Sequence, residues 1–385
     1  MRIYFDYNAT APVDPAAASA MCEALRNAWG NPSSVHALGQ QAKAVIDDAR
    51  SAMAELLNAE PGEIVLTSGG TEADNLAIRG AAEAKAREGR RHVIASAIEH
   101  EAVLNTVKAL GRQGWRTSLL PVGRSGVVEP ASLAAVLDEG TALVSVMHVN
   151  NETGTVQPVA DLARLAHDRG ALFHTDAVQS VGRIPVDVRQ LGADLVSCSG
   201  HKFGAPKGAG ALWIRRGVAL TPHITGGRQE RSRRAGTENV PAIAGLGAAA
   251  RSAGRGIVDR AARVGALRDT LERGILAAVP DCAVNGDTEA RAPNTTNISF
   301  ARTEGESLLI ALDLEGIAVS TGSACSSGTL DPSHVLAAMG LPVWRVQGAV
   351  RFSLGGGTTA EEVDLVLSVL PRIVSRLRSL SGPGR

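Results

Sequence analysis

The chain has 385 residues with 39 acidic and 39 basic side chains, so no net charge draws it to nucleic acid or to a membrane surface. Aromatic residues make up 3% of the chain, which leaves few side chains on which single-stranded bases could stack. No run of about 18 apolar residues occurs and the first residues lack the apolar run of a signal peptide, so neither a membrane span nor secretion is expected. The length predicts two packed domains.

Four cysteines, Cys22, Cys198, Cys282 and Cys325, lie far apart in the sequence. This spacing fits neither a disulfide framework nor a zinc site, so no metal is expected, and the cytoplasm is the expected compartment. Cys22 and Cys198 have apolar neighbours and are interpreted as core residues. Cys282 has no chemical context and is interpreted as structural too.

Short apolar runs alternate with helical patterns over about the first 240 residues. The expected strands are residues 63–67, 92–96, 143–148, 171–175, 194–197 and 211–214. The expected helices among them are residues 72–87, 102–112 and 159–168. Such alternation is typical of an α/β domain with a mostly parallel sheet covered on both faces. Ligands in these domains bind at the carboxyl ends of the strands.

The pattern changes after about residue 239. An Ala/Gly/Arg segment predicts one long helix to about Leu276, followed by strands at 296–300, 317–319 and 349–354 and helices at 304–314 and 360–380. We expect a smaller α+β domain that the N-terminal segment completes. The predicted boundaries are 14–256 for the large domain, and 1–13 with 257–385 for the small one. The Gly/Pro-rich tail from Ser381 is expected to fray.

Polar loops follow several of the expected strands. Residues 67–71, TSGGT, lie between a strand and a helix, where glycines and a helix N-terminus could hold a phosphate. An ordinary tight turn with Thr71 as the N-cap explains the same residues equally well. No GxGxxG follows the first strand, which disfavours a dinucleotide fold.

Asp176 and Lys202 come at the ends of successive expected strands. Asp176 could cap a helix, and Lys202 could be a solvated surface charge. Beside pyridoxal 5'-phosphate (PLP), an aspartate would instead keep the ring nitrogen protonated, and a lysine would bind the aldehyde. Their order, with a phosphate loop upstream, favours the PLP interpretation.

Nine segments together resemble the motifs of the cysteine desulfurase family, in the branch that supplies iron–sulfur cluster assembly and includes nitrogenase-associated members. They are DYNATAPVDP (6–15), GNPSS (30–34), TSGGTEADN (67–75), VNNETG (149–154), HTDAVQ (174–179), SGHKFGAPKG (199–208), RRAGTEN (233–239), STGSACSSG (320–328) and VRFSLG (350–355). The resemblance covers the chain to about residue 370. It implies a homodimer with the aspartate-aminotransferase-like fold, PLP-dependent transferase fold type I, whose large domain has a mostly parallel seven-stranded sheet.

The resemblance also implies a role for each matched residue. Lys202 would hold PLP covalently, Asp176 would pair with the ring nitrogen, and His100 would stack on the ring and move protons. Asn151 and Gln179 would reach the phenolic oxygen. The phosphate would be held by Gly70, Thr71, Ser199 and His201, together with Thr237 of the partner subunit. The basic run 228–234 could suggest nucleic-acid binding, but a loop that reaches across a dimer fits the neutral chain better.

Cys325 lies among Gly, Ser and Ala residues, where packing gives no reason for a cysteine. Five extended residues span roughly 16 Å, so such a loop could carry a thiol into a site and withdraw it. A free thiol is only a few per cent thiolate at neutral pH, so it needs activation.

Arg351 lies in a predicted strand in which Val350, Phe352 and Leu354 share one face. Arg351 on the other face could be solvated, or it could clamp the carboxylate of an amino acid between two hydrogen bonds. The resemblance favours the clamp and implies that Asn151 also binds the substrate.

These residues predict an enzyme that converts L-cysteine to alanine. Lys202 would remove the proton from Cα, and the Cys325 thiolate would take the sulfur as a persulfide. The expected partners are an iron–sulfur scaffold protein or another sulfur acceptor, including a cluster or metal-bound sulfur that touches Cys325 during transfer. The alternatives are another enzyme of this fold, such as a selenocysteine lyase, kynureninase or aminotransferase, and a PLP-binding regulatory protein.

Overall fold

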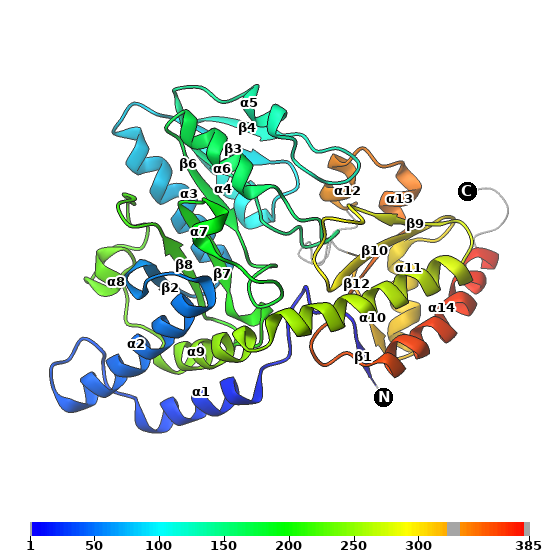
Figure 1. The fold of residues 1–385 in the computed structure, drawn as a ribbon, viewed down its shortest axis with the longest axis horizontal. Coiled ribbons are helices and arrows are strands. Elements are labelled where there is room, and N and C mark those ends of the chain that lie inside the picture. Colours follow the sequence, from blue (N-terminus) through cyan, green and yellow to red (C-terminus); the bar gives the residue numbers. More distant parts are fainter. Residues whose placement is uncertain (1, 322–331, 381–385) are drawn as a thin grey trace.

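The computed structural model describes residues 2–321 and 332–380 (Figure 1). Its larger part contains a seven-stranded sheet, which confirms the expected α/β class with a mostly parallel sheet. The strands lie in the order β2 (Ile64–Thr67), β8 (Gly210–Ile214), β7 (Leu195–Ser199), β6 (Leu172–Asp176), β5 (Thr141–Ser145), β3 (His92–Ser96) and β4 (Arg116–Leu120). The strands from β7 to β4 are parallel, and β8 is antiparallel to both of its neighbours.

The apolar runs predict six of these seven strands. The exception is β4, an edge strand in which only Leu120 is buried, so it lacks the apolar run of an interior strand. β5 ends at Ser145, three residues before its predicted end. The chain beyond it still bonds to β6, with Val146 N donating to His174 O at 3.1 Å.

Helices cover both faces of the large sheet (Figure 1). Neighbouring strand residues such as Val65 and Leu66 belong to different buried clusters, as the two-residue period of a strand requires. One face packs against α3 (Gly70–Ala86) and α4 (Glu101–Arg112). The other packs against α1 (Pro15–Asn27), α2 (Ala37–Leu57), α6 (Val159–Asp168) and α9 (Val240–Gly254). Short helices are α5 (Pro130–Ala134) and α7 (Val188–Leu191), whereas the segment labelled α8 (Gln229–Ser232) is a turn with left-handed backbone angles.

The smaller part combines an antiparallel sheet with long helices. Its strands are β12 (Ala349–Ser353), β10 (Thr295–Phe300) and β9 (Cys282–Asn285), with a parallel pair formed by β1 (Ile3–Tyr4) and β11 (Ile317–Ala318). Its helices are α10 (Ile257–Ala278), α11 (Gly305–Leu314), α12 (His334–Ala338), α13 (Val343–Gln347) and α14 (Ala360–Leu380). Ile3 and Phe5 are buried in its core, so the N-terminal segment completes it.

The single helix predicted to run to Leu276 is wrong. α9 ends at Gly254, and α10 begins at Ile257. Gly256 between them has φ of +58°, a left-handed conformation that a right-handed helix cannot include. One buried cluster spans residues 17–250 and another joins residues 3 and 5 to residues 264–374. The domain boundaries 14–256 and 1–13 with 257–385 stay a prediction, because a further buried cluster joins Ile98 to residues 335–349.

The cysteine predictions hold for one residue and fail for another. Cys198 is fully buried on β7, as predicted, and burial raises the pKa of its thiol. Cys22 is exposed, because α1 turns Ala17 and Ala24 inward instead. Cys282 is half-buried. Among the helices described, none has the length and apolar character needed to cross a bilayer.

Candidate active site

The polar loops meet at one edge of the seven-stranded sheet. β6 and β7 are parallel, so Asp176 and Ser199 end their strands at the same edge. β2 and β7 are each antiparallel to β8, so the turn after Thr67 reaches this edge too. The carboxyl ends of these strands therefore assemble one site, as expected for this class of fold.

Two glycines form the turn between β2 and α3, Gly69 for its backbone conformation and Gly70 for the lack of space around it. Gly69 has φ of +156° and ψ of −174°, a region open essentially to glycine. A Cβ on Gly70 would lie 2.9 Å from Val178 Cγ2 and 3.4 Å from Ser199 Cβ. α3 begins at Gly70, so the interpretation of Thr71 as an N-cap is wrong; Thr71 lies in the first turn. The first N–H groups of a helix lack acceptors within it, so this turn is suited to bind a phosphate.

Asp176 is a buried carboxylate, only 5% exposed. Its Oδ1 accepts a hydrogen bond from Val178 N at 2.9 Å, which closes a turn rather than starting a helix. Burial raises the pKa of Asp176, and nearby His100 and Lys202 act in the opposite direction. A buried carboxylate held ionised by cations can bind a protonated ring nitrogen.

Two more buried carboxyls, Asp74 and Glu99, lie near Asp176, and the sequence does not single them out. Burial, followed by the charge of Asp176, raises the pKa of Asp74 well above its ordinary value. Burial raises the pKa of Glu99 to about 8, although Ser96 Oγ and Met147 N both donate to Glu99 Oε1. Glu99 therefore keeps its proton near neutral pH, and the raised pKa of Asp74 favours its protonated form as well.

Lys202 lies in the 3₁₀ turn Gly200–Lys202 that follows β7. Its Nζ donates to Asn8 O at 2.7 Å and to Ala9 O at 2.9 Å, so it is not the solvated surface lysine of the alternative interpretation. His201 Nδ1 lies 3.1 Å from Thr10 Oγ1. Burial lowers the pKa of His201 to about 4, with Lys202 acting in the same direction, so this ring is neutral.

His100 is the N-cap of α4, and Ala102 N donates to its Nδ1 at 3.1 Å. Nδ1 therefore carries no proton, and in the neutral ring Nε2 does. The backbone of α4 fixes this tautomer, so neutral His100 can donate a hydrogen bond from Nε2.

Arg351 is 2% exposed, so the alternative of a solvated arginine is wrong. Its Nη2 donates to Asp6 Oδ1 at 2.7 Å, and its Nη1 donates to Asn151 O at 2.9 Å. Val350 and Phe352 pack into the small core on the opposite face, as strand alternation predicts. A guanidinium with a fixed orientation faces the large domain.

Asn8 was missed by sequence reasoning, although it stands in the first matched segment. It is 2% exposed and its Nδ2 donates to Asn151 O at 3.0 Å and to Thr295 Oγ1 at 2.9 Å. Besides Lys202, Gln179 also donates to Asn8 O, through Nε2 at 3.1 Å. Asn8 thus links the lysine, two predicted cofactor residues and the small domain.

Thr237 is exposed on the loop that follows α8. Cys325 lies outside the described residues. The chain just before the undescribed stretch is paired with Arg351, with Ser320 N donating to Arg351 O at 3.2 Å. Just after it, Ser333 Oγ donates to Glu152 Oε2 at 2.5 Å. The segment with Cys325 therefore starts and ends beside strand β12 and the loop after β5.

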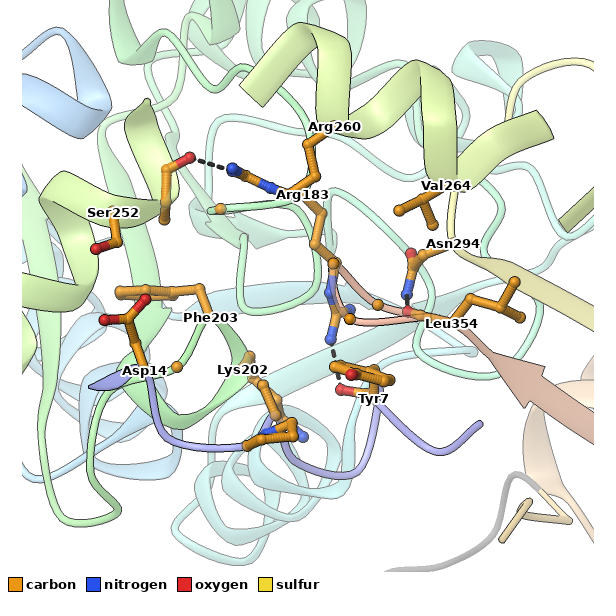
Figure 2. A pocket seen from close by; sticks show the side chains of 18 of the residues that line it. Tyr7, Asp14, Arg183, Lys202, Phe203, Ser252, Arg260, Val264, Asn294 and Leu354 are labelled. Carbon is orange, nitrogen blue, oxygen red and sulfur yellow. Dashed lines mark hydrogen bonds between the residues drawn. The ribbon is translucent and has the colours of Figure 1, made fainter. Parts of the chain in front are cut away.

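A cavity of about 350 Å³ lies between the two core clusters next to Lys202 (Figure 2). It is lined by Phe203 and Arg183 from the large part and by Val264 and Leu354 from the small part. The candidate cofactor lysine therefore adjoins open space between the domains.

The described residues fit PLP. The glycine turn and helix N-terminus suit a phosphate, the buried anion Asp176 suits a protonated pyridine, and the half-buried amine of Lys202 suits an aldehyde. The alternative of a PLP-binding protein without catalysis is not favoured, because Arg351 is buried beside the same site.

Comparisons with known proteins agree with this geometry. The family model for aminotransferase class-V matches residues 3–366. A protein named cysteine desulfurase from Trichormus azollae is 50% identical over 379 residues, covering 98% of this chain and 94% of that protein. A solved NifS-like protein has a TM-score of 0.91 and 39% identity, covering 98% of this chain and all of that chain. A structure described as SspA in complex with cysteine has a TM-score of 0.81 and 34% identity, covering 93% and 100% of the two chains.

Proposed function

The chain belongs to the class-V aminotransferase family of PLP-dependent enzymes, and we propose that it is a cysteine desulfurase acting on free L-cysteine. One observation carries the proposal most strongly. Buried Asp176, inward-pointing Lys202 and buried Arg351 meet beside both ends of the segment that holds Cys325. An aminotransferase needs the first three and has no use for the cysteine.

PLP, when bound, withdraws electrons from the substrate Cα and so weakens bonds to that carbon and its neighbour. Asp176 would keep the ring nitrogen protonated, and the glycine turn would hold the phosphate. The residues proposed for the phosphate are Gly70, Thr71, Ser199 and His201. Those proposed for the ring and its phenolic oxygen are His100, Asn151 and Gln179.

Arg351 would bind the carboxylate of cysteine. Its Nε has no hydrogen-bond partner among the described residues, although it is buried, so a donor is left for the substrate. Asp6 holds the guanidinium in orientation through Nη2. A guanidinium that is already fixed loses little entropy on binding, which favours a small charged substrate.

The sulfur step is a thiolate attack. Lys202 takes the proton from Cα, the Cys325 thiolate forms an S–S bond with the substrate sulfur, and the Cβ–S bond breaks with its electron pair going to the substrate. Protonation of the remaining fragment gives alanine, and Cys325 keeps a persulfide. The Cys325 thiol must lose its proton before the attack. Because Nδ1 of His100 accepts from Ala102 N, the neutral ring offers the site a hydrogen-bond donor at Nε2.

The persulfide would then pass to an acceptor, an iron–sulfur scaffold protein or another sulfur acceptor, in the cytoplasm. The enzyme would be a homodimer in which Thr237 of the partner subunit completes the phosphate site. The exposure of Thr237 supports this arrangement.

Replacing Cys325 tests the function. Cys325→Ala should keep its PLP and still bind cysteine, but form no persulfide and release alanine more than about 100-fold slower, roughly 2.7 kcal/mol of barrier. Cys22→Ala, on the exposed face of α1, is the matched control and should form both products normally. Alanine release by Cys325→Ala at the wild-type rate would refute the persulfide mechanism. The sulfur would then leave by elimination.

A further inference from the structure

The loop that carries Thr237 begins with a strained turn. Glu230, Arg231 and Ser232 have φ of 45°, 56° and 63°, which places three consecutive non-glycine residues in the left-handed region. L-residues adopt this conformation singly and at a cost, so a run of three persists only where its surroundings hold it.

Glu230 holds this turn to strand β2. Its side chain is 1% exposed, and Arg50 Nη1 and Nη2 each donate to one of its carboxylate oxygens at 2.6 Å. Leu66 N donates to Glu230 Oε2 at 2.8 Å. Arg50 also donates to Ile64 O at 2.8 Å. The strained turn is thereby fixed to the strand that leads directly into the glycine turn at Gly69.

A second ion pair fixes the loop on the other side of the glycine turn. Arg234 Nε donates to Glu72 Oε1 at 2.7 Å, and Arg234 Nη2 donates to Glu72 Oε2 at 3.1 Å. Glu72 lies in the first turn of α3, and its Oε2 also accepts from Ser68 N at 2.8 Å. The Thr237 loop is thus attached to the chain both before and after the phosphate-binding turn of its own subunit.

The far end of the loop has polar groups that the described residues do not satisfy. Arg233 Nη1 and Glu238 Oε2 are buried without a hydrogen-bond partner among the described residues, and Thr237 between them is exposed. Buried polar atoms nearly always have partners. Of these three residues only Thr237 is exposed, so Thr237 is the one that can contact a surface beyond its own subunit.

We propose that Glu230 is a positioning residue that presents Thr237 to the cofactor phosphate in the other subunit of the dimer, using its own β2 as the anchor. The inference rests on the homodimer proposed above. Glu230 then acts mainly in trans: its loss weakens the cofactor site that receives its loop more than the site in its own subunit.

Hybrid dimers separate these two effects. One subunit carries Lys202→Ala, so PLP can attach covalently only to the other. Dimers are isolated with two different affinity tags, titrated with PLP, reduced with borohydride and analysed by mass spectrometry for the pyridoxyl label. With Glu230→Gln on the Lys202→Ala subunit, the PLP concentration for half-maximal labelling should rise about tenfold, the size of one hydrogen bond to a charged group. With Glu230→Gln on the lysine-bearing subunit, it should change less than about twofold.

Glu55→Gln, at an exposed position of α2, is the matched control in both placements and should change neither titration. If Glu230→Gln does not fold, Arg234→Gln breaks the second attachment and should show the same asymmetry. If the PLP concentration for half-maximal labelling rises only when Glu230→Gln is on the lysine-bearing subunit, the inference is overturned. Glu230 would then support the phosphate site of its own subunit. The same PLP concentration for half-maximal labelling with Glu230→Gln on either subunit would also overturn the inference, but it would leave the desulfurase function intact. Failure of the unmodified chain to dimerise or bind PLP would overturn the proposed function itself.

Discussion

Replacing Asn8 with alanine should destabilise the junction between the two domains. The Asn8 side chain makes three hydrogen bonds at this junction, to Asn151 O, to Thr295 Oγ1 and from Asn294 Nδ2 at 2.9 Å. All three partners keep another hydrogen bond. Arg351 also donates to Asn151 O, Asn294 Nδ2 also donates to Leu354 O at 3.3 Å, and Thr295 Oγ1 also donates to Asn294 Oδ1 at 3.3 Å. At about 1 kcal/mol for each lost bond, the free energy of unfolding should fall by about 3 kcal/mol.

Urea denaturation followed by tryptophan fluorescence, at one protein concentration and saturating PLP, measures this change. Asn27→Ala is the control, since Asn27 is exposed on α1 with one side-chain bond to Glu23, and its effect should stay within about 0.5 kcal/mol. A fall in the free energy of unfolding of less than about 1 kcal/mol for Asn8→Ala would contradict this prediction. The former partners of Asn8 would then have found hydrogen bonds to water or to one another.

Three further changes test the site. Lys202→Ala should lose the borohydride-stable pyridoxyl label that wild-type protein carries on its Lys202 peptide; a label elsewhere would exclude this lysine. Arg351→Lys should raise KM for cysteine about tenfold or more while PLP binding stays normal, because a lysine cannot make two parallel bonds to a carboxylate; an unchanged KM would place the carboxylate elsewhere. Because Glu99 keeps its proton up to about pH 8 in the folded chain but loses it near its ordinary pKa in the unfolded chain, stability from this residue falls as pH rises towards 8, by about 1.4 kcal/mol per unit. Glu99→Gln should flatten the fall in melting temperature between pH 5 and 8, and an equally steep fall would contradict the buried acid.

Local patterns predicted the large sheet and the face of Arg351. Strand alternation places Val350 and Phe352 in the small core because a period of two is a property of neighbouring residues. The same logic failed for Cys22, since apolar neighbours on α1 do not reveal which side of the helix packs. It failed also for β4, whose exposure at the sheet edge removes the apolar run.

The polar contacts of the site could not be read from the sequence. The partners of Asn8 are separated from it in the sequence by between 143 and 345 positions, and no local periodicity encodes such pairs. The buried acids Asp74 and Glu99 look like ordinary helix and loop residues until the fold removes water from them. The motif match marked the region of Asn8, whereas its contacts came only from the three-dimensional structure.

The pairing of the N-terminal segment with β11 and β12 has a consequence for how the protein is made. Asp6 and Arg351 are separated by 345 residues, which a ribosome adding about 5–20 residues per second needs roughly 20–70 s to synthesise. The buried cluster formed by residues 17–250 can fold during that time. Ile3 and Phe5 can pack only after the residues of the small domain have been synthesised. Asn8 takes its final position beside Lys202 only when the second domain has folded. We therefore expect that a nascent chain forms its phosphate-binding turn long before the surroundings of Lys202 are complete. Cofactor loading is therefore expected to follow translation.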